Sequence, residues 1–204
     1  MTVNNAQKKL KVAVTGGIGS GKSLAMKVIS SLGYPVFSAD DIYAEIISRE
    51  ENAVACSKLL GIDVLYVDDK AIFDRAAASK KVFDDEVLRN KLNEYAHKLV
   101  YEEIDNIFKN QTKTTFFEIP LLFESGRQND FDRVIVILRD RGERIKSVEI
   151  RDGKNAGFIE KIISAQFDYD NMPATEHTII RNDKDRSSFI ERVKKVVESI
   201  VVSQ

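Results

Sequence analysis

The feature that most constrains this chain is a glycine-rich segment at residues 16–23, with the sequence Gly-Gly-Ile-Gly-Ser-Gly-Lys-Ser. It fits the phosphate-binding loop pattern, in which a glycine and four further residues precede Gly-Lys-Ser or Gly-Lys-Thr. An apolar run at residues 12–14 precedes it and an amphipathic run at residues 24–29 follows it. This is the strand-loop-helix setting that the pattern requires, so an ordinary glycine-rich turn is the less favoured interpretation.

Each part of this loop has a physical role. Glycines allow the backbone to approach a ligand closely, so that successive N–H groups converge on phosphate oxygens at the positive end of the following helix. Lys22 would then lie along the β- and γ-phosphates, and the Ser23 hydroxyl would bind Mg²⁺. The loop residues expected to contact the nucleotide are Gly17, Ile18, Gly19, Ser20, Gly21, Lys22 and Ser23.

Length and charge limit the possible classes of protein. The 204 residues are enough for one sizeable α/β core with an insertion or two. The 31 Lys and Arg residues nearly balance the 32 Asp and Glu residues, which gives a formal charge of -1. The protein therefore has no large net positive charge that would attract nucleic acid or an anionic membrane. We expect small molecules rather than either of these as partners.

The sequence also suggests a cytoplasmic protein without an obligate protein partner. Cys56 is the only cysteine, which excludes an internal disulfide framework and a zinc site built from several cysteines. Residues 1–9 are polar, lack the apolar centre of a signal peptide and are expected to form a frayed lead-in. We expect no membrane span, because no run approaches the roughly 20 apolar residues that a span needs.

Apolar runs and helical patterns predict an α/β fold, with a parallel sheet flanked by helices. The strand at residues 10–15 is expected in the middle of the sheet, because its continuous apolar run indicates two covered faces. The remaining strands are expected at residues 36–37, 114–120, 131–138 and 177–180, and the clearest helices at residues 22–31, 158–166 and 188–201.

Residues 41–110 form a helical, charged insertion in this interpretation. Apolar residues recur there at spacings of three and four, as in amphipathic helices. Residues 61–70 are expected to form a turn region between helices. About seventy residues without a central strand are too many for one crossover connection, so we expect this part to bind the second substrate.

A charged segment follows the predicted strand at residues 131–138. Six basic and four acidic residues lie between positions 139 and 154. Such a segment is usually a solvated helix face, and we expect Arg139, Arg141 and Arg144 to be solvated. Its position directly after a core strand also suits a small basic lid that closes over a nucleotide and excludes water.

Two carboxylates, Asp40 and Asp41, follow the predicted strand at residues 36–37. Ligands of open α/β sheets bind at the carboxyl ends of the strands. A hydroxyl group that attacks phosphorus needs a carboxylate to orient it and take its proton, and Asp40 is the candidate. The alternative for either residue is a capping role in a helix that starts at residue 41.

Other proteins with phosphate loops fit this sequence less well. Guanine-specific switch proteins have an Asn/Thr-Lys-x-Asp segment, whereas residues 181–184 read Arg-Asn-Asp-Lys. Against a motor or transporter ATPase, the chain is short and has no second recognisable nucleotide module. The remaining interpretation is a small-molecule kinase, whose acceptor these features leave open. The alternative is a protein that is not an enzyme, namely a nucleotide-binding regulatory module without catalysis.

Several motifs together resemble the dephospho-coenzyme A kinase family. They follow the family's order over about residues 10–185: Thr-Gly-Gly-Ile-Gly-Ser-Gly-Lys-Ser at 15–23, Val-Phe-Ser-Ala-Asp at 36–40, Phe-Asp-Arg at 73–75, His97, Ile-Pro-Leu-Leu-Phe-Glu at 119–124 and Asp-Arg-Val-Ile-Val at 132–136. The resemblance implies a nucleoside-monophosphate-kinase-like fold with a core (10–40, 111–140 and 166–204), an acceptor domain (41–110) and a lid (141–165). It also implies ATP-dependent phosphorylation of the ribose 3′-hydroxyl of dephospho-coenzyme A.

The same resemblance implies roles for individual residues. Asp40, Lys22 and Arg151 would be catalytic, and Asn182 and Leu24 would contact ATP. Asp40, Arg75, His97, Leu122 and Glu124 would bind the acceptor. An equal alternative for His97 is a structural role, as a hydrogen-bonded histidine at a packing interface. The alternative for Glu124 is an ordinary loop carboxylate without a binding role. The chain departs from the family's usual residues at Leu24, Ser38, Lys98, Arg144, Ser147 and His177.

Overall fold

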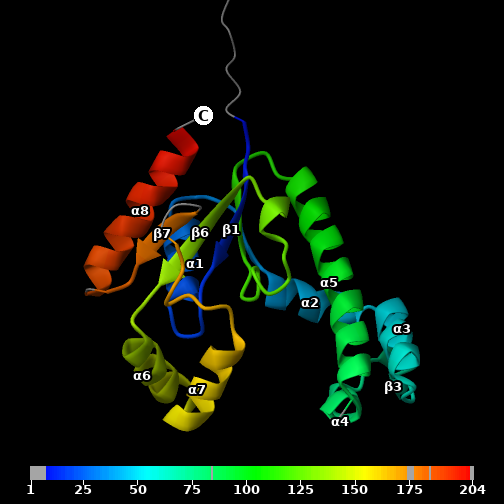
Figure 1. The fold of residues 1–204 in the computed structure, drawn as a ribbon. Coiled ribbons are helices and arrows are strands. Elements are labelled where there is room, and N and C mark those ends of the chain that lie inside the picture. Colours follow the sequence, from blue (N-terminus) through cyan, green and yellow to red (C-terminus); the bar gives the residue numbers. More distant parts are fainter. Residues whose placement is uncertain (1–7, 84, 174–176, 184, 203–204) are drawn as a thin grey trace, which may run out of the picture. The chain divides into compact units, whose positions relative to one another are not determined.

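A five-stranded parallel sheet lies at the centre of the larger of two units of the chain. The computed structural model describes residues 8–83, 85–173, 177–183 and 185–202, so residues 1–7 of the expected lead-in and Lys184 lie outside the described residues. The strand order β2-β5-β1-β6-β7 confirms the predicted central position of the first strand (Figure 1). The strands are β1 (Lys11–Thr15), β2 (Val36–Ser38), β5 (Thr115–Glu118), β6 (Arg133–Leu138) and β7 (Thr178–Arg181).

Two helices cover one face of this sheet. Helix α1 (Lys22–Ser31) directly follows the glycine-rich loop, and helix α8 (Arg186–Val202) packs beside it (Figure 1). Apolar side chains from both helices meet alternate side chains of the strands, as the period of two in a strand requires. The buried residues of this core include Val12, Val14, Met26, Ile29, Phe116, Ile135, Ile137, Phe189, Val193 and Val197.

The parallel pairing brings the carboxyl ends of the strands to one edge of the sheet. In β1, Val14 lies opposite Glu118 of β5, and Ala13 lies opposite Val134 of β6. Ser38, the last residue of β2, also lies opposite Glu118. The segments that follow all five strands therefore start from the same edge, where the topology of open α/β sheets places ligands.

Two further helices belong to the same unit. Helix α6 (Arg141–Asp152) follows β6, and helix α7 (Ala156–Ala165) packs against it. Their N-termini are capped by side chains, since Asp140 accepts from the Glu143 N–H at 3.1 Å and Asn155 accepts from the Phe158 N–H at 2.9 Å. A small group of apolar residues joins these helices to the loop and is called the α6–α7 cluster below: Ile18, Ile145, Val148, Ile159 and Ile163. A short 3₁₀ helix, η1 (Gln128–Asp130), precedes β6.

The second unit comprises Ala39–Lys109 and is mainly helical. Its helices are α2 (Ala39–Ser48), α3 (Glu50–Leu60), α4 (Arg75–Phe83) and α5 (Glu86–Lys109). Arg49 links the end of α2 to α5, because its Nη2 lies 2.9 Å from Oε1 of Glu103 and 3.1 Å from Oε1 of Glu45. The buried interior of the unit contains Ile42, Ile46, Ile47, Ala53, Cys56, Leu60, Ala71, Ala78, Val100, Tyr101 and Ile104.

The expectation of a plain turn region at residues 61–70 is wrong. Strands β3 (Leu65–Val67) and β4 (Lys70–Ile72) pair antiparallel there as a hairpin. Asp68 and Asp69 form its two-residue turn with φ values of 50° and 60°. Two-residue hairpin turns with positive φ at both positions match the twist of the strands, and aspartate tolerates this conformation.

Among the helices that the structure describes, none combines the length and the apolar character that crossing a membrane would require.

Candidate active site

The glycine-rich loop has the geometry of a phosphate cradle. It leaves β1 at the buried Thr15 and ends at Gly21, which precedes α1 in the left-handed conformation, with φ 108°. Gly19 also has a positive φ, of 74°. A Cβ atom at Gly19 would lie 2.6 Å from the carbonyl oxygen of Arg144, and one at Gly21 would lie 2.6 Å from Nδ2 of Asn182. The backbone conformation therefore favours glycine at both positions, and at Gly19 the nearby backbone oxygen also leaves no space for a side chain.

Lys22 folds back over this loop from the first turn of α1. Its Nζ donates to the carbonyl oxygens of Gly16 at 2.7 Å and Gly17 at 3.2 Å. The ammonium group thus stands beside the backbone that would surround a phosphate group. Ser23 is exposed on the same turn, at the positive end of the helix dipole. The cradle, the cation and the hydroxyl suit a nucleoside triphosphate with a bound metal ion.

Asn182 supports the loop from the segment that follows β7. Its Nδ2 donates to the carbonyl oxygen of Ser20 at 2.9 Å, and its backbone N–H donates to the carbonyl oxygen of Leu138 at 2.7 Å. The family resemblance implies that Asn182 contacts the adenine end of ATP. The structure brings this side chain to the phosphate loop, where it holds the Ser20 carbonyl in place.

The expectation that Arg139 and Arg144 are solvated is wrong. Arg144 is 2% exposed, and Arg139 Nη1 donates to Ser147 Oγ at 2.6 Å and to the Gly19 carbonyl oxygen at 3.3 Å. Arg144 turns toward the loop because the buried stripe of α6, with Val148 one turn after it, packs there. Arg141 is exposed, as predicted.

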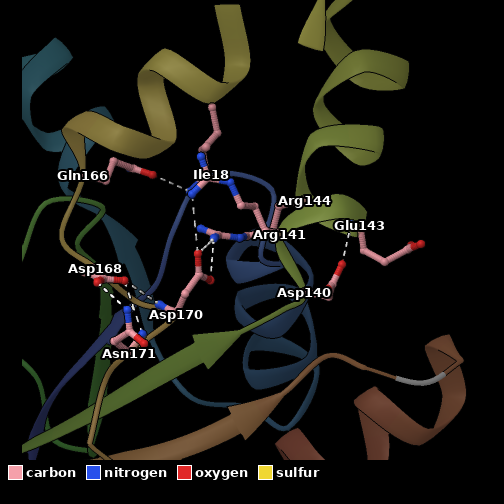
Figure 2. Close-up of polar contacts among 9 residues, drawn as sticks. All are labelled: Ile18, Asp140, Arg141, Glu143, Arg144, Gln166, Asp168, Asp170 and Asn171. Atoms are coloured by element: carbon pink, nitrogen blue, oxygen red, sulfur yellow. Dashed lines mark hydrogen bonds and ion pairs between the residues drawn. The ribbon is translucent and has the colours of Figure 1, made fainter. Parts of the chain in front are cut away.

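The segment at residues 166–171, directly after α7, also contacts the loop and was missed by sequence reasoning. Gln166 Oε1 accepts from the Ile18 N–H at 2.9 Å, and the Tyr169 hydroxyl lies 3.2 Å from Thr15 Oγ1 (Figure 2 shows the first contact). Asp170 binds Arg144. These partners lie far from the loop along the chain, so no local pattern marks them.

Tyr169 should make the stability of the protein sensitive to alkaline pH. Burial raises the pKa of its hydroxyl from the usual 10 to about 12, although the hydrogen bond with Thr15 opposes this shift. Between pH 10 and pH 12 the unfolded chain loses this proton more readily than the native protein does, so stability falls as pH rises, by about 2 kcal/mol over this range. Denaturant unfolding at pH 8, 10 and 11.5 measures the fall.

Tyr169→Phe is the matched variant for this measurement. It lacks the titrating hydroxyl, and it should lose about 1 kcal/mol at pH 8 because the hydrogen bond to Thr15 is gone. Its further loss between pH 10 and pH 12 should be smaller than that of the original chain. Equal losses in the two proteins would show that other groups cause the alkaline effect.

Arg151, the expected lid arginine, lies exposed in the last turn of α6. Its Nε and Nη2 donate to the two carboxylate oxygens of Asp152 at 2.7 and 2.8 Å, and this pairing raises the pKa of the guanidinium. A phosphate group would have to replace Asp152 as the partner of Arg151. The catalytic role of Arg151 stays a prediction.

The segment after β5 contributes Leu122 and Glu124. Leu122 is fully buried, so its side chain belongs to the interior. Glu124 Oε1 accepts from the Phe167 N–H at 2.8 Å, and the rings of Phe123 and Phe167 lie 4.7 Å apart. Glu124 therefore fastens the 166–171 segment to the edge of the sheet. An acceptor-binding role for these two residues stays a prediction.

The other expected site residues belong to the second unit. Asp40 and Asp41 are exposed in the first turn of α2, which begins at Ala39, two residues earlier than predicted. Acidic side chains in this turn suit the helix dipole. Arg75 is the exposed first residue of α4, and His97 is exposed in the middle of α5. Their roles also stay predictions.

A metal ion would depend on few protein ligands here. In the part of the chain that the structure describes, no group of three or more His, Cys, Asp or Glu side chains is arranged to hold one. Mg²⁺ in phosphoryl-transfer sites is usually held by one or two protein groups together with substrate phosphates and waters. The exposed Ser23 hydroxyl beside the cradle fits this pattern.

Comparison with known proteins identifies the family of this chain. The family model for dephospho-CoA kinase matches residues 10–187. The chain belongs to the dephospho-CoA kinase family. It is 31% identical over 184 residues to the family member of Sodalis glossinidius, which covers 89% of this chain and 88% of the relative. It is 30% identical over 203 residues to that of Chlorobaculum tepidum, with 96% of this chain and 97% of the relative covered.

The structure is similar to solved structures as well. The dephospho-CoA kinase from Campylobacter jejuni superposes with a TM-score of 0.71 at 27% identity, over 95% of this chain and 98% of that one. A gluconokinase from Sinorhizobium meliloti, 11% identical, reaches a TM-score of 0.53 over 95% and 94% of the two chains, which shows a shared fold only. The fold is that of the P-loop kinases, and the chain is an ATP-dependent kinase that phosphorylates a hydroxyl group.

Proposed function

We propose that this chain transfers the γ-phosphoryl group of ATP to the 3′-hydroxyl of the ribose of dephospho-CoA, the last step of coenzyme A synthesis. The match of one family model to residues 10–187 carries the proposal. The phosphate cradle and Lys22 supply what the chemistry needs on the nucleotide side. Phosphoryl transfer depends mainly on positioning and on stabilising charge, rather than on covalent chemistry by the protein.

On the nucleotide side, the backbone of residues 16–21 would hold the phosphates of ATP, and Leu24 would lie beside them at the start of α1. Lys22 would neutralise charge that develops on the transferred group. Ser23 would hold Mg²⁺, which neutralises phosphate charge when bound. Arg151 would exchange Asp152 for the phosphates as α6 and α7 cover the nucleotide, which also excludes water.

On the acceptor side, Asp40 would act as the general base. A ribose hydroxyl is a weak nucleophile, and a carboxylate within hydrogen-bond reach can orient it and accept its proton as the bond to phosphorus forms. Asp40 follows β2 by two residues, and β2 ends at the edge of the sheet from which the phosphate loop starts. The unit Ala39–Lys109 would bind the rest of dephospho-CoA through Arg75 and His97, together with Leu122 and Glu124.

A competition between acceptors tests the proposed function. Purified protein with Mg²⁺, ATP and dephospho-CoA should produce equal amounts of ADP and coenzyme A. With dephospho-CoA and a nucleoside monophosphate at equal concentration, dephospho-CoA should be consumed faster by at least about 100-fold, because polar groups built for one acceptor are left unpaired by another. The proposal would be contradicted if neither ADP nor coenzyme A formed, or if the nucleoside monophosphate were used in preference to dephospho-CoA.

A further inference from the structure

Helix α6 places one charged side chain in the interior beside the phosphate loop. Arg144 is 2% exposed, and among the described residues it is the one buried side chain that carries a charge at neutral pH. A buried charge is unfavourable unless it is paired. Arg144 Nη2 donates to Oδ1 of Asp170 at 2.7 Å and to Oδ2 at 3.0 Å, so one end of the guanidinium is neutralised (Figure 2).

The other end of this guanidinium lies against Gly17. Gly17 is not one of the glycines with a positive φ, so the backbone conformation does not require glycine there. A Cβ atom at position 17 would overlap with Nη1 of Arg144, so a side chain there would displace either the guanidinium or the loop. Arg144 Nε is buried and has no hydrogen-bond partner in the described structure. The guanidinium is therefore held by Asp170 on one side and by contact with the loop on the other.

Gly17 is also a point at which Lys22 is held. Its carbonyl oxygen accepts from Lys22 Nζ at 3.2 Å, so Gly17 is close to both cationic side chains. The next residue, Ile18, is fixed from the same direction. Its N–H donates to Gln166 and its side chain enters the α6–α7 cluster. The position of this part of the loop, and with it that of Lys22, thus depends on α6 and on the 166–171 segment.

Asp170 is itself held in place by a turn. Its N–H donates to Asp168 Oδ1 at 3.2 Å, and Asp168 also accepts from the side chain of Asn171 at 2.8 Å (Figure 2). On the preceding side, Tyr169 is buried and bonded to Thr15. The carboxylate that faces Arg144 is therefore preorganised, which a fixed ion pair requires.

We propose that Arg144 and Asp170 form a positioning pair for phosphoryl transfer: the guanidinium, held by Asp170, fixes the peptide of Gly17 and thereby the ammonium group of Lys22. This inference rests on the proposed function. The pair acts through the loop and not on the substrates. A displacement of about 1 Å in a group that positions reactants can lower a rate by about 100-fold, so the pair should affect kcat more than substrate binding.

Two single substitutions test the pair from its two sides. Arg144→Gln and Asp170→Asn should each lower kcat by about 10- to 100-fold, while the KM for dephospho-CoA changes by less than about twofold. The double variant should be no slower than the slower single variant, because residues that act as a unit do not add. Arg141→Gln is the control, since exposed Arg141 lies 3.8 Å from the same carboxylate, and it should keep the original kcat.

A second cycle separates positioning of the loop from a general effect on folding. Gly17→Ala should lower kcat strongly in the original chain, because the new methyl group overlaps with Arg144. In the Arg144→Gln background that overlap is absent, so Gly17→Ala should cause less than about a threefold further loss. Thermal unfolding shows which variants are folded. We expect Arg144→Gln to fold, because the carboxylate that loses its partner, Asp170, is partly exposed to solvent.

Two results would overturn the positioning pair: the original kcat in folded Arg144→Gln and Asp170→Asn, or an equal effect of Gly17→Ala in both backgrounds. If the original chain makes no coenzyme A, the proposed function fails instead. The same variants are then compared by their hydrolysis of Mg²⁺-bound ATP without an acceptor. That reaction also depends on Lys22, so a drop of about tenfold supports the pair and an unchanged rate overturns it.

Discussion

Asp40→Asn is expected to slow the formation of coenzyme A by about 10²- to 10⁴-fold, the range for loss of a general base. An amide cannot accept the proton of the attacking hydroxyl, although it fills the same space as the carboxylate. Asp40 is exposed in the first turn of α2, so the substitution disturbs no buried contact. ADP release in a coupled assay gives kcat, and calorimetric titration should show unchanged ATP binding.

Asp41→Asn is the matched control for this prediction. Asp41 is the next residue in the same turn of α2 and is also exposed, so both substitutions change the same helix dipole interaction. We expect Asp41→Asn to keep kcat within about threefold of the original value. A near-normal rate in Asp40→Asn, or equal losses in both variants, would show that another group takes the proton.

The nucleotide side of the site could be predicted from the sequence because it is local. The loop, the strand before it and the helix after it lie within residues 11–31, so the whole motif is contained in one short stretch of sequence. The apolar run of β1 also predicted its central place in the sheet, since a strand with two covered faces has no polar alternation. The structure confirms the central position of β1 and the strand-loop-helix setting of the glycine-rich loop.

The surroundings of Arg144 could not be predicted in the same way. A run of alternating charges reads as a solvated helix face, and whether one member is buried depends on a partner. That partner, Asp170, is 26 residues further along the chain, beyond a second helix. Gln166 and Ile18 are 148 residues apart. Such contacts follow from tertiary packing, and the sequence pattern of α6 does not contain them.

The hairpin of the second unit was missed for a different reason. Each strand has only three residues, and Leu65, Tyr66 and Val67 of β3 are all exposed, so β3 shows no alternation of buried and exposed side chains. The Asp68–Asp69 turn is a local signal that could have indicated the hairpin, because Asp is one of the residues that adopts positive φ.

Lys22→Ala is expected to lower kcat by about 10³-fold, the effect of removing a preorganised group that stabilises charge in the transition state. The ammonium group now donates to Gly16 and Gly17 and would serve the β- and γ-phosphates of ATP. Lys27→Ala is the control, because Lys27 is exposed on the same helix and should keep the original rate. A Lys22→Ala protein with more than about a tenth of the original kcat would contradict this role.

A second measurement on Lys22→Ala separates it from Asp40→Asn. Hydrolysis of ATP by water needs charge stabilisation on the phosphates but does not need a base for the ribose hydroxyl. Asp40→Asn should therefore retain the slow hydrolysis that the original chain shows without acceptor, while Lys22→Ala should lose it. Equal loss in both variants would mean that Asp40 acts on the nucleotide and not only on the acceptor hydroxyl.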